Sequence, residues 1–138
     1  MTLDQIVARF RQADRQTRLD ALLDYSRRLA PVPDHLWQGA DREAHRVHEC
    51  QTPVFLWVEV RPDGITLHAD IPREAPTVRG FVSLLARGIA DATPAEVAAI
   101  PGDLLDLLGL GDALGMTRTQ GLTAVLHRVK RMVRAVPT

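Results

Sequence analysis

A β-hairpin in the middle of the chain constrains the fold more than any other feature. Within residues 52–60, valine and leucine alternate with aromatic and acidic side chains, which is the period of a β-strand. The Arg-Pro-Asp-Gly sequence at 61–64 favours a tight turn, because proline presets one backbone dihedral and glycine permits a positive one. Residues 65–70 then form the returning strand. Both faces of the first strand are apolar near Trp57, so we expect it to be central in a sheet or covered by helices.

Helical periodicity precedes the hairpin. Apolar spacing predicts a short helix over residues 3–10, and a second helix that is capped by Asp14 and ends before two prolines at 31 and 33. Residues 34–45 are polar and follow no regular pattern. We expect a short strand over residues 46–49.

After the hairpin the apolar period changes from two to 3.6 residues. It predicts a helix over residues 77–89, a short helix that starts with the capping-box sequence at 93–96, another short helix at 103–108, and a last helix from about residue 119. Strands flanked by helices on both sides indicate an α+β fold, with a small antiparallel β-sheet packed against helices.

Length and composition restrict the class of protein. A chain of 138 residues suits one domain, so we expect a single domain over residues 1–138. Lysine plus arginine and aspartate plus glutamate both total 17, and a neutral chain is not typical of nucleic-acid binding. We see no apolar run near the roughly 18 residues that span a membrane and no secretory signal. With only one cysteine, these features predict a cytoplasmic protein.

The single cysteine, Cys50, lies just before the first predicted strand. It has no partner for an internal disulfide and cannot form a cysteine-rich metal site. The thiol therefore either reacts with a group on another molecule or is an inert, buried side chain, which is common for free cysteine.

Four segments resemble one known family. The sequence at 47–56, VHECQTPVFL, is similar to the Gly-Cys-Gln-Ser-Gln-Val-Trp motif of the SufE family. EAPTVRGFVSLL at 74–85 resembles that family's Ala-x-Ile-Val-Lys/Arg-Gly-Leu helix start, and TPAEV at 93–97 resembles its Thr-Pro-x-Glu/Asp-Ile. LGMTRTQGL at 114–122 is similar to its Leu-Ser/Thr-Pro-Ser-Arg-Ser-Gln/Asn-Gly-Leu. The order and spacing of the segments hold over nearly the whole chain.

The resemblance implies a SufE/IscU-like fold and a sulfur carrier that is not itself an enzyme. Cys50 would take persulfide sulfur from a SufS-type cysteine desulfurase, stimulate that enzyme, and deliver sulfur to a SufBCD-like scaffold complex for iron–sulfur cluster assembly. We expect no bound cofactor, because pyridoxal phosphate (PLP) belongs to the partner desulfurase. We also expect no nucleic-acid or membrane partner, and a monomer or weak homodimer.

The resemblance also suggests residues that contact the partner: Arg118, Glu74, Gln51 and His48. A guanidinium at position 118 suits carboxylates or another anionic group of the partner, although it could equally pair with a surface carboxylate of its own chain. Two departures lie beside the thiol. Glu49 replaces the glycine of the family motif and adds a negative charge, and Pro53 replaces a common glutamine.

Two other functions remain open. His45, His48 and Cys50 could form part of a metal-binding scaffold or metallochaperone, with His35 and Asp41 close enough in sequence to complete the site, although the spacing matches no established metal motif. Alternatively, the chain regulates a desulfurase without accepting sulfur.

Several features have structural explanations. The basic residues at 127–134 lie toward the carboxyl end of the last helix, where positive charge interacts favourably with the helix dipole. Gly80 and Gly121 suit close packing rather than phosphate binding. Because a persulfide needs protection from reductants, we expect Cys50 to be partly buried in the free protein and to swing out on docking.

Overall fold

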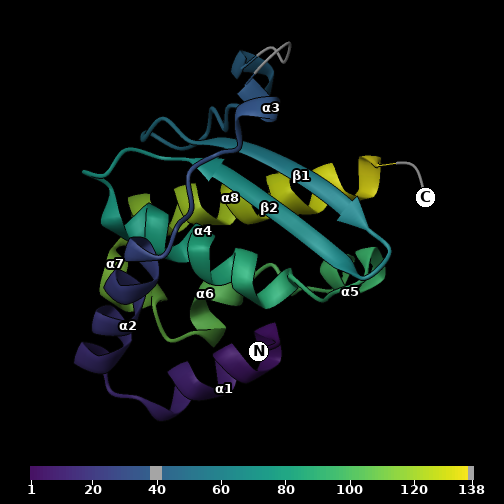
Figure 1. Cartoon of the computed structure of the whole chain (residues 1–138). Coiled ribbons are helices and arrows are strands. Elements are labelled where there is room, and N and C mark those ends of the chain that lie inside the picture. Colours follow the sequence, from purple (N-terminus) through teal and green to yellow (C-terminus); the bar gives the residue numbers. More distant parts are fainter. Residues whose placement is uncertain (38–41, 137–138) are drawn as a thin grey trace.

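The computed structural model describes residues 1–37 and 42–136, and the predicted hairpin lies across one side of it (Figure 1). Strands β1 (Phe55–Arg61) and β2 (Gly64–Asp70) pair antiparallel along their whole length. They are the only strands in the described residues. One isolated bridge also pairs Arg46 with Phe55 at the start of β1. The strand predicted over 46–49 is therefore wrong apart from Arg46. The hairpin with helices on both sides in sequence confirms the α+β fold class.

The hairpin turn contains a glycine for a reason that the sequence did not indicate. We expected Gly64 to adopt a positive φ, but the positive-φ glycines of the described residues are Gly109 and Gly115. A Cβ atom at Gly64 would instead lie 1.8 Å from the carbonyl oxygen of Ala90, which also accepts a hydrogen bond from Ile65 N at 3.2 Å. Glycine is required there because the turn packs directly on the helix that follows the hairpin.

Two long helices, α4 (Pro76–Ile89) and α8 (Met116–Ala135), cover one face of the hairpin. Helix α4 packs against β2, and α8 packs against β1. The core between the two layers consists of fully buried apolar side chains, among them Leu56, Ile65, Phe81, Leu85, Leu122 and Leu126. Burial of such side chains is the main stabilising contribution to the fold.

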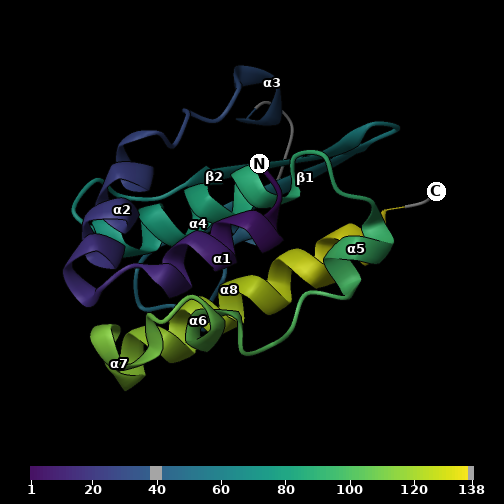
Figure 2. The same cartoon turned by 90° about the horizontal axis from the view of Figure 1, so that it is seen from below.

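The amino-terminal helices α1 (Leu3–Gln12) and α2 (Arg15–Arg27) form a further layer against α4 (Figure 2). Asp14 caps α2 as predicted, with its carboxylate accepting a hydrogen bond from Thr17 N at 2.8 Å. The two helices α2 and α4 approach closely at Gly80, where a Cβ atom would lie 2.3 Å from the carbonyl oxygen of Leu22. The prediction that Gly80 serves close packing is confirmed.

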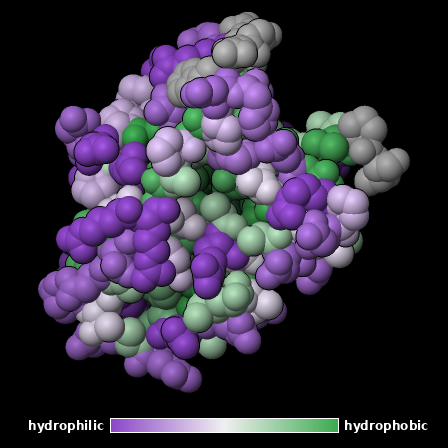
Figure 3. Space-filling model, in the orientation of Figure 1, coloured by the Kyte–Doolittle hydropathy of each residue, from purple (hydrophilic) through white to green (hydrophobic). Residues whose placement is uncertain are grey.

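The opposite face of the hairpin is covered only in part. Phe55 and Trp57 are buried there against Val32 and Leu36, so β1 is covered on both faces but is not central in its sheet. Residues 34–45, predicted to be irregular, contain the short helix α3 (Asp34–Trp37) and the 3₁₀ turn η1 (Arg42–His45). Hydrophilic side chains cover much of this side of the molecule, and apolar surface shows between them (Figure 3).

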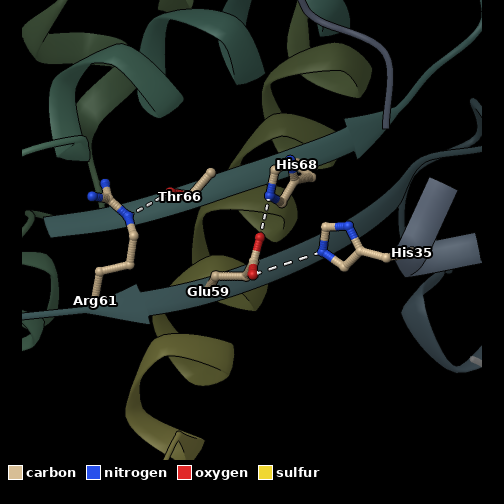
Figure 4. A network of polar contacts seen from close by, with 5 residues as sticks. All are labelled: His35, Glu59, Arg61, Thr66 and His68. Carbon is tan, nitrogen blue, oxygen red and sulfur yellow. Dashed lines mark hydrogen bonds and ion pairs between the residues drawn. The ribbon is translucent and has the colours of Figure 1, made fainter. Parts of the chain in front are cut away.

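Polar contacts continue this outer face beyond the aromatic residues. The carboxylate of Glu59 on β1 contacts His68 Nε2 on β2 at 2.6 Å and His35 Nε2 of α3 at 3.9 Å (Figure 4). Arg61 Nε donates to the hydroxyl of Thr66 at 2.8 Å. These contacts connect α3 to both strands.

Three short helices lead from α4 to α8: α5 (Pro94–Ala98), α6 (Leu104–Leu107) and α7 (Gly111–Leu114). Helix α5 begins with the predicted capping box of Thr93 and Glu96. Helix α7 was not predicted, and α8 begins at Met116 rather than near Thr119. Among the described residues, we find no helix with the length and apolar content needed to cross a membrane.

Candidate functional site

Cys50 lies on a loop whose two ends are fastened together. Val47 N donates to the carbonyl oxygen of Val54 at 2.8 Å, and both valines are fully buried. The Arg46–Phe55 bridge joins the same ends one residue further out. Residues 48–53 therefore form a short excursion from the edge of the sheet, held at its base by the rigid hairpin.

The thiol of Cys50 is buried in the free protein, with a residue exposure of 7%. It packs against α8 at Gly121, where an added Cβ atom would lie 3.5 Å from Cys50 Sγ. The loop lies close to α8 at this glycine, where the added Cβ atom would still be at an ordinary contact distance. Cys50 is therefore sheltered from solvent, as the sequence predicts for the free protein.

A pocket of about 390 Å³ lies beside the buried thiol. Three segments line it: residues 49–52 of the loop, residues 74–78 at the start of α4, and residues from 117 to 122 at the start of α8. These segments are distant in sequence, and the fold brings them together because α4 and α8 both begin at the end of the hairpin where the loop lies. Each belongs to a stretch that resembles the SufE family.

Two oppositely charged side chains line this pocket. Arg118, in the first turn of α8, donates from Nη1 to the Thr77 hydroxyl at 3.2 Å and so joins the starts of α8 and α4. Within residues 1–37 and 42–136 it forms no ion pair, so the surface pairing considered for it is not observed. Glu74 is exposed just before α4. The pocket thus offers a cation and an anion to a molecule that approaches Cys50.

Four of the five predicted site residues meet at this pocket: Cys50, Gln51, Glu74 and Arg118. The fifth, His48, does not line it. Its side chain is exposed, and Nε2 lies 4.0 Å from a carboxylate oxygen of Glu43. Although His48 is only two residues from the cysteine, the loop turns between them.

The histidines considered as metal ligands make other contacts. His45 Nδ1 is 2.8 Å from the carbonyl oxygen of Leu56, and its ring stacks on Trp57 with centroids 5.0 Å apart. His35 faces Glu59, and Asp41 lies outside the described residues. In the described part of the chain, no group of three or more histidine, cysteine or acidic side chains is arranged to hold a metal ion.

The structure adds pocket residues that we did not single out from the sequence. Thr77 provides the hydroxyl that orients Arg118, and Thr117 and Gln120 line the pocket from α8. All three lie inside the segments that resemble the SufE family, so that resemblance was the available signal. Residue type alone gave none, because threonine and glutamine are common at helix starts.

Comparison with known proteins agrees with the pocket and the fold. The family model SufE, described as an Fe-S metabolism associated domain, matches residues 4–133, and the chain belongs to this family. A SufE-like protein of Mycobacterium tuberculosis is 38% identical over 133 residues, which cover 96% of this chain and 91% of the relative. The sulfur acceptor protein CsdE of Escherichia coli is 31% identical over 109 residues, which cover 78% of this chain and 71% of CsdE.

A solved structure shows the same fold. The solution structure of a hypothetical protein from Thermus thermophilus superposes with a TM-score of 0.82 at 34% sequence identity. The match covers 97% of this chain and 96% of that one. The resemblance predicted from the sequence is therefore confirmed at the level of family and of fold.

Proposed function

We propose that this protein is a sulfur acceptor that receives persulfide sulfur on Cys50 from a cysteine desulfurase. The observation that carries the proposal is the position of Cys50, a lone cysteine that packs beside a pocket formed by the three SufE-like segments. Membership of the SufE family and similarity to the sulfur acceptor CsdE support it.

The proposed transfer needs no oxidant or reductant. The Cys50 thiolate attacks the outer sulfur of the donor's cysteine persulfide, because the thiolate is the nucleophilic form. A bond forms between Cys50 Sγ and that sulfur as the donor's sulfur–sulfur bond breaks, and the donor cysteine leaves as a thiolate. Cys50 then carries the persulfide. With no second cysteine in the chain, no internal thiol can discharge it as a disulfide.

Transfer requires the thiol to leave its contact with α8. Because the ends of the loop are held by the Val47–Val54 hydrogen bond, residues 48–53 can move while the hairpin and the helices stay in place. In the free protein the buried position protects a loaded persulfide from reductants. We infer that docking of the donor enzyme displaces the loop.

The charged residues of the pocket would recognise the donor. Arg118 is already oriented by Thr77, so its planar guanidinium can bind a carboxylate or another anion of the partner at little entropic cost. Glu74 and Gln51 supply hydrogen-bond acceptors at the same pocket. His48 lies outside it and, in this proposal, contacts the partner only at the rim.

The wider proposal places the protein in iron–sulfur cluster assembly. It would act in the cytoplasm as a monomer or weak homodimer, stimulate a SufS-type desulfurase by clearing that enzyme's cysteine, and pass sulfur to a SufBCD-like scaffold. PLP would belong to the desulfurase, and this chain would be a carrier rather than an enzyme.

Intact-mass measurement tests the proposal. The protein is incubated with a cysteine desulfurase, PLP and cysteine, and we expect a mass gain of one sulfur atom on Cys50. The Cys50→Ser variant should fold, which circular dichroism checks, and should gain none, because its hydroxyl cannot hold sulfane sulfur.

Other outcomes would reject the proposed role. Sulfur on the Cys50→Ser variant would show that another group accepts it. An unmodified wild-type protein that still stimulates the desulfurase would support the regulator that accepts no sulfur. A metal adduct in place of added sulfur would support the metallochaperone.

A further inference from the structure

Helix α8 carries charge of only one sign. Between Met116 and Ala135 it has no aspartate or glutamate, and its charged residues are Arg118, Arg128, Lys130, Arg131 and Arg134. The preceding residues 91–112 have the opposite bias, with no lysine or arginine and the acidic residues Asp91, Glu96, Asp103, Asp106 and Asp112. Charge is therefore segregated within a chain whose net charge is zero.

The helix dipole explains only part of this pattern. Its favourable effect on cations falls off within the last turn, which in α8 contains Arg134. Lys130 and Arg131 lie before that turn. Like charges three and four residues apart on one helix face repel one another, so a cluster of this kind destabilises the isolated helix slightly.

Three of the cations of α8, Lys130, Arg131 and Arg134, line an open groove of about 470 Å³ on the outer face of the helix. The helix contributes His127, Lys130, Arg131 and Arg134, whose spacing places them on one face. Lys130 Nζ donates to the carbonyl oxygen of Ile100 at 2.6 Å. Arg131 and Arg134 are exposed, and within residues 1–37 and 42–136 neither has a hydrogen-bond or ion-pair partner.

Some arginines elsewhere on the surface are paired with carboxylates. Arg42 Nη2 lies 2.7 Å from Asp70, and Arg61 Nη1 lies 2.8 Å from Asp63. The groove on α8 differs from these sites, because it gathers Lys130, Arg131 and Arg134 on one face, and neither guanidinium group has a carboxylate partner among the described residues.

The groove is continuous with the Cys50 site. Glu49 lines both the groove and the pocket beside the thiol, so a molecule that covers the pocket also reaches the groove. The same helix supports the loop. Arg128 donates from Nη2 to Ala44 O at 2.7 Å and from Nη1 to Arg46 O at 3.2 Å, which fixes the segment that leads into the loop.

We propose that this groove docks an acidic segment of the sulfur-donor desulfurase, a proposal that rests on the sulfur-acceptor function. Charge complementarity of this kind raises the association rate and fixes the orientation of the partner. Glu49 stands at the end nearest the thiol and repels acidic residues there. The partner's acidic segment therefore lies along α8, and its reactive cysteine lies over the pocket.

Paired charge variants test the docking groove. The Arg131→Gln/Arg134→Gln variant removes the unpaired guanidinium groups, and Arg9→Gln/Arg11→Gln is a matched control. The control removes the same charge from exposed positions near the end of α1 that line neither the pocket nor the groove. Thermal unfolding checks that both variants fold.

Binding to the full-length desulfurase is measured by calorimetry at several salt concentrations. We expect the α8 variant to bind about tenfold more weakly at low salt and to lose much of the salt dependence, because charge pairs at interfaces account for both. The control should stay within about twofold of wild type. Glu49→Gln should bind more tightly, because it removes a repulsive charge from the groove.

The outcomes separate the two proposals. If wild type and the α8 variant bind the desulfurase with equal affinity and Cys50 still gains sulfur, the docking groove is overturned and the acceptor function stands. If binding depends on Arg131 and Arg134 but Cys50 gains no sulfur, the acceptor function is overturned and the docking groove stands. A short DNA duplex that competes with the desulfurase at equimolar concentration would overturn the choice of an acidic protein segment.

Discussion

At the scale of single residues, the contact between Cys50 and Gly121 determines how the thiol is sheltered. The Cys50 loop lies on α8 at Gly121, where an added Cβ atom would be in contact with Cys50 Sγ. Gly121 is inside a regular helix, where glycine costs roughly 0.5–1 kcal/mol relative to alanine. Because an added Cβ atom would lie at an ordinary contact distance from Sγ, the thiol can be buried beside alanine as well as beside glycine.

The Gly121→Ala variant tests this contact. Its new methyl group would lie 3.5 Å from Sγ, an ordinary contact distance, so we expect the fold to be kept and the free energy of unfolding to rise by about 0.5–1 kcal/mol. Alkylation of Cys50 under native conditions should slow several-fold, because the methyl group adds cover.

Thr123→Ala is the matched control, because it also raises helix propensity and Thr123 does not line the Cys50 pocket. It should stabilise the protein without changing the alkylation rate. Faster alkylation of the Gly121→Ala variant would show that the loop does not rest on α8 as described.

At the scale of elements, side-chain caps mark the starts of α1, α2 and α5. Asp14 caps α2, and hydrogen bonds from the side chain and then the backbone N–H of Thr17 hold the pKa of its carboxyl below the usual value of 3.8. The ionised carboxylate is thus favoured in the folded state. Its contribution to stability is present above the unfolded pKa and is lost as the pH falls through the folded one.

The pH dependence of Asp14→Ala checks this capping. We expect the variant to melt below wild type at pH 7, because α2 loses its cap, and the difference to shrink as the pH is lowered below about 3.8. Asp14→Asn keeps a neutral cap and serves as the control. A difference between wild type and alanine variant that grows on acidification would contradict the assignment.

The sequence predicted elements with a strong local pattern and missed those set by distant contacts. The hairpin, α4 and the capping box of α5 each have a clear period or a specific cap. Helix α7 and the early start of α8 lack a side-chain cap, so no local signal marks them. Cys50, Glu74 and Arg118 were named through family resemblance, and the pocket that they line was not predicted. Thr77 was missed because its role depends on an arginine distant in sequence.

At the scale of the whole molecule, α4 joins the amino-terminal layer to the rest. It packs on α2 and α1 on one side and on β2 and α8 on the other. The close approach at Gly80 lets α2 lie directly on α4. The amino-terminal helices are therefore part of the same folded unit as the Cys50 site.

Gly80→Ala is expected to destabilise the entire protein. The added Cβ atom would lie 2.3 Å from the backbone oxygen of Leu22, so α2 must shift, and we expect a loss of about 3 kcal/mol. The melting temperature should fall by roughly 10 °C. Gly102→Ala is the control, since its nearest neighbour, His127, would be 3.8 Å away.

Differential scanning calorimetry measures both glycine variants. Gly102→Ala should stay within about 0.5 kcal/mol of wild type, because its methyl group meets no close neighbour. If Gly80→Ala were as stable as Gly102→Ala, the two helices would not be in direct backbone contact, and the layer of α1 and α2 would be less tightly joined than described.

The fastened base of the Cys50 loop also sets a limit on what the thiol can reach. On its shorter side, the loop runs three residues from the anchor at Val47 to the thiol at Cys50. Three residues of fully extended chain span at most about 10 Å. A donor whose sulfur lies deeper than this tether length would have to bring it outward on a mobile arm of its own. Under the proposed function, this tether length limits how deep in a donor's active site a sulfur atom can lie and still be reached by Cys50.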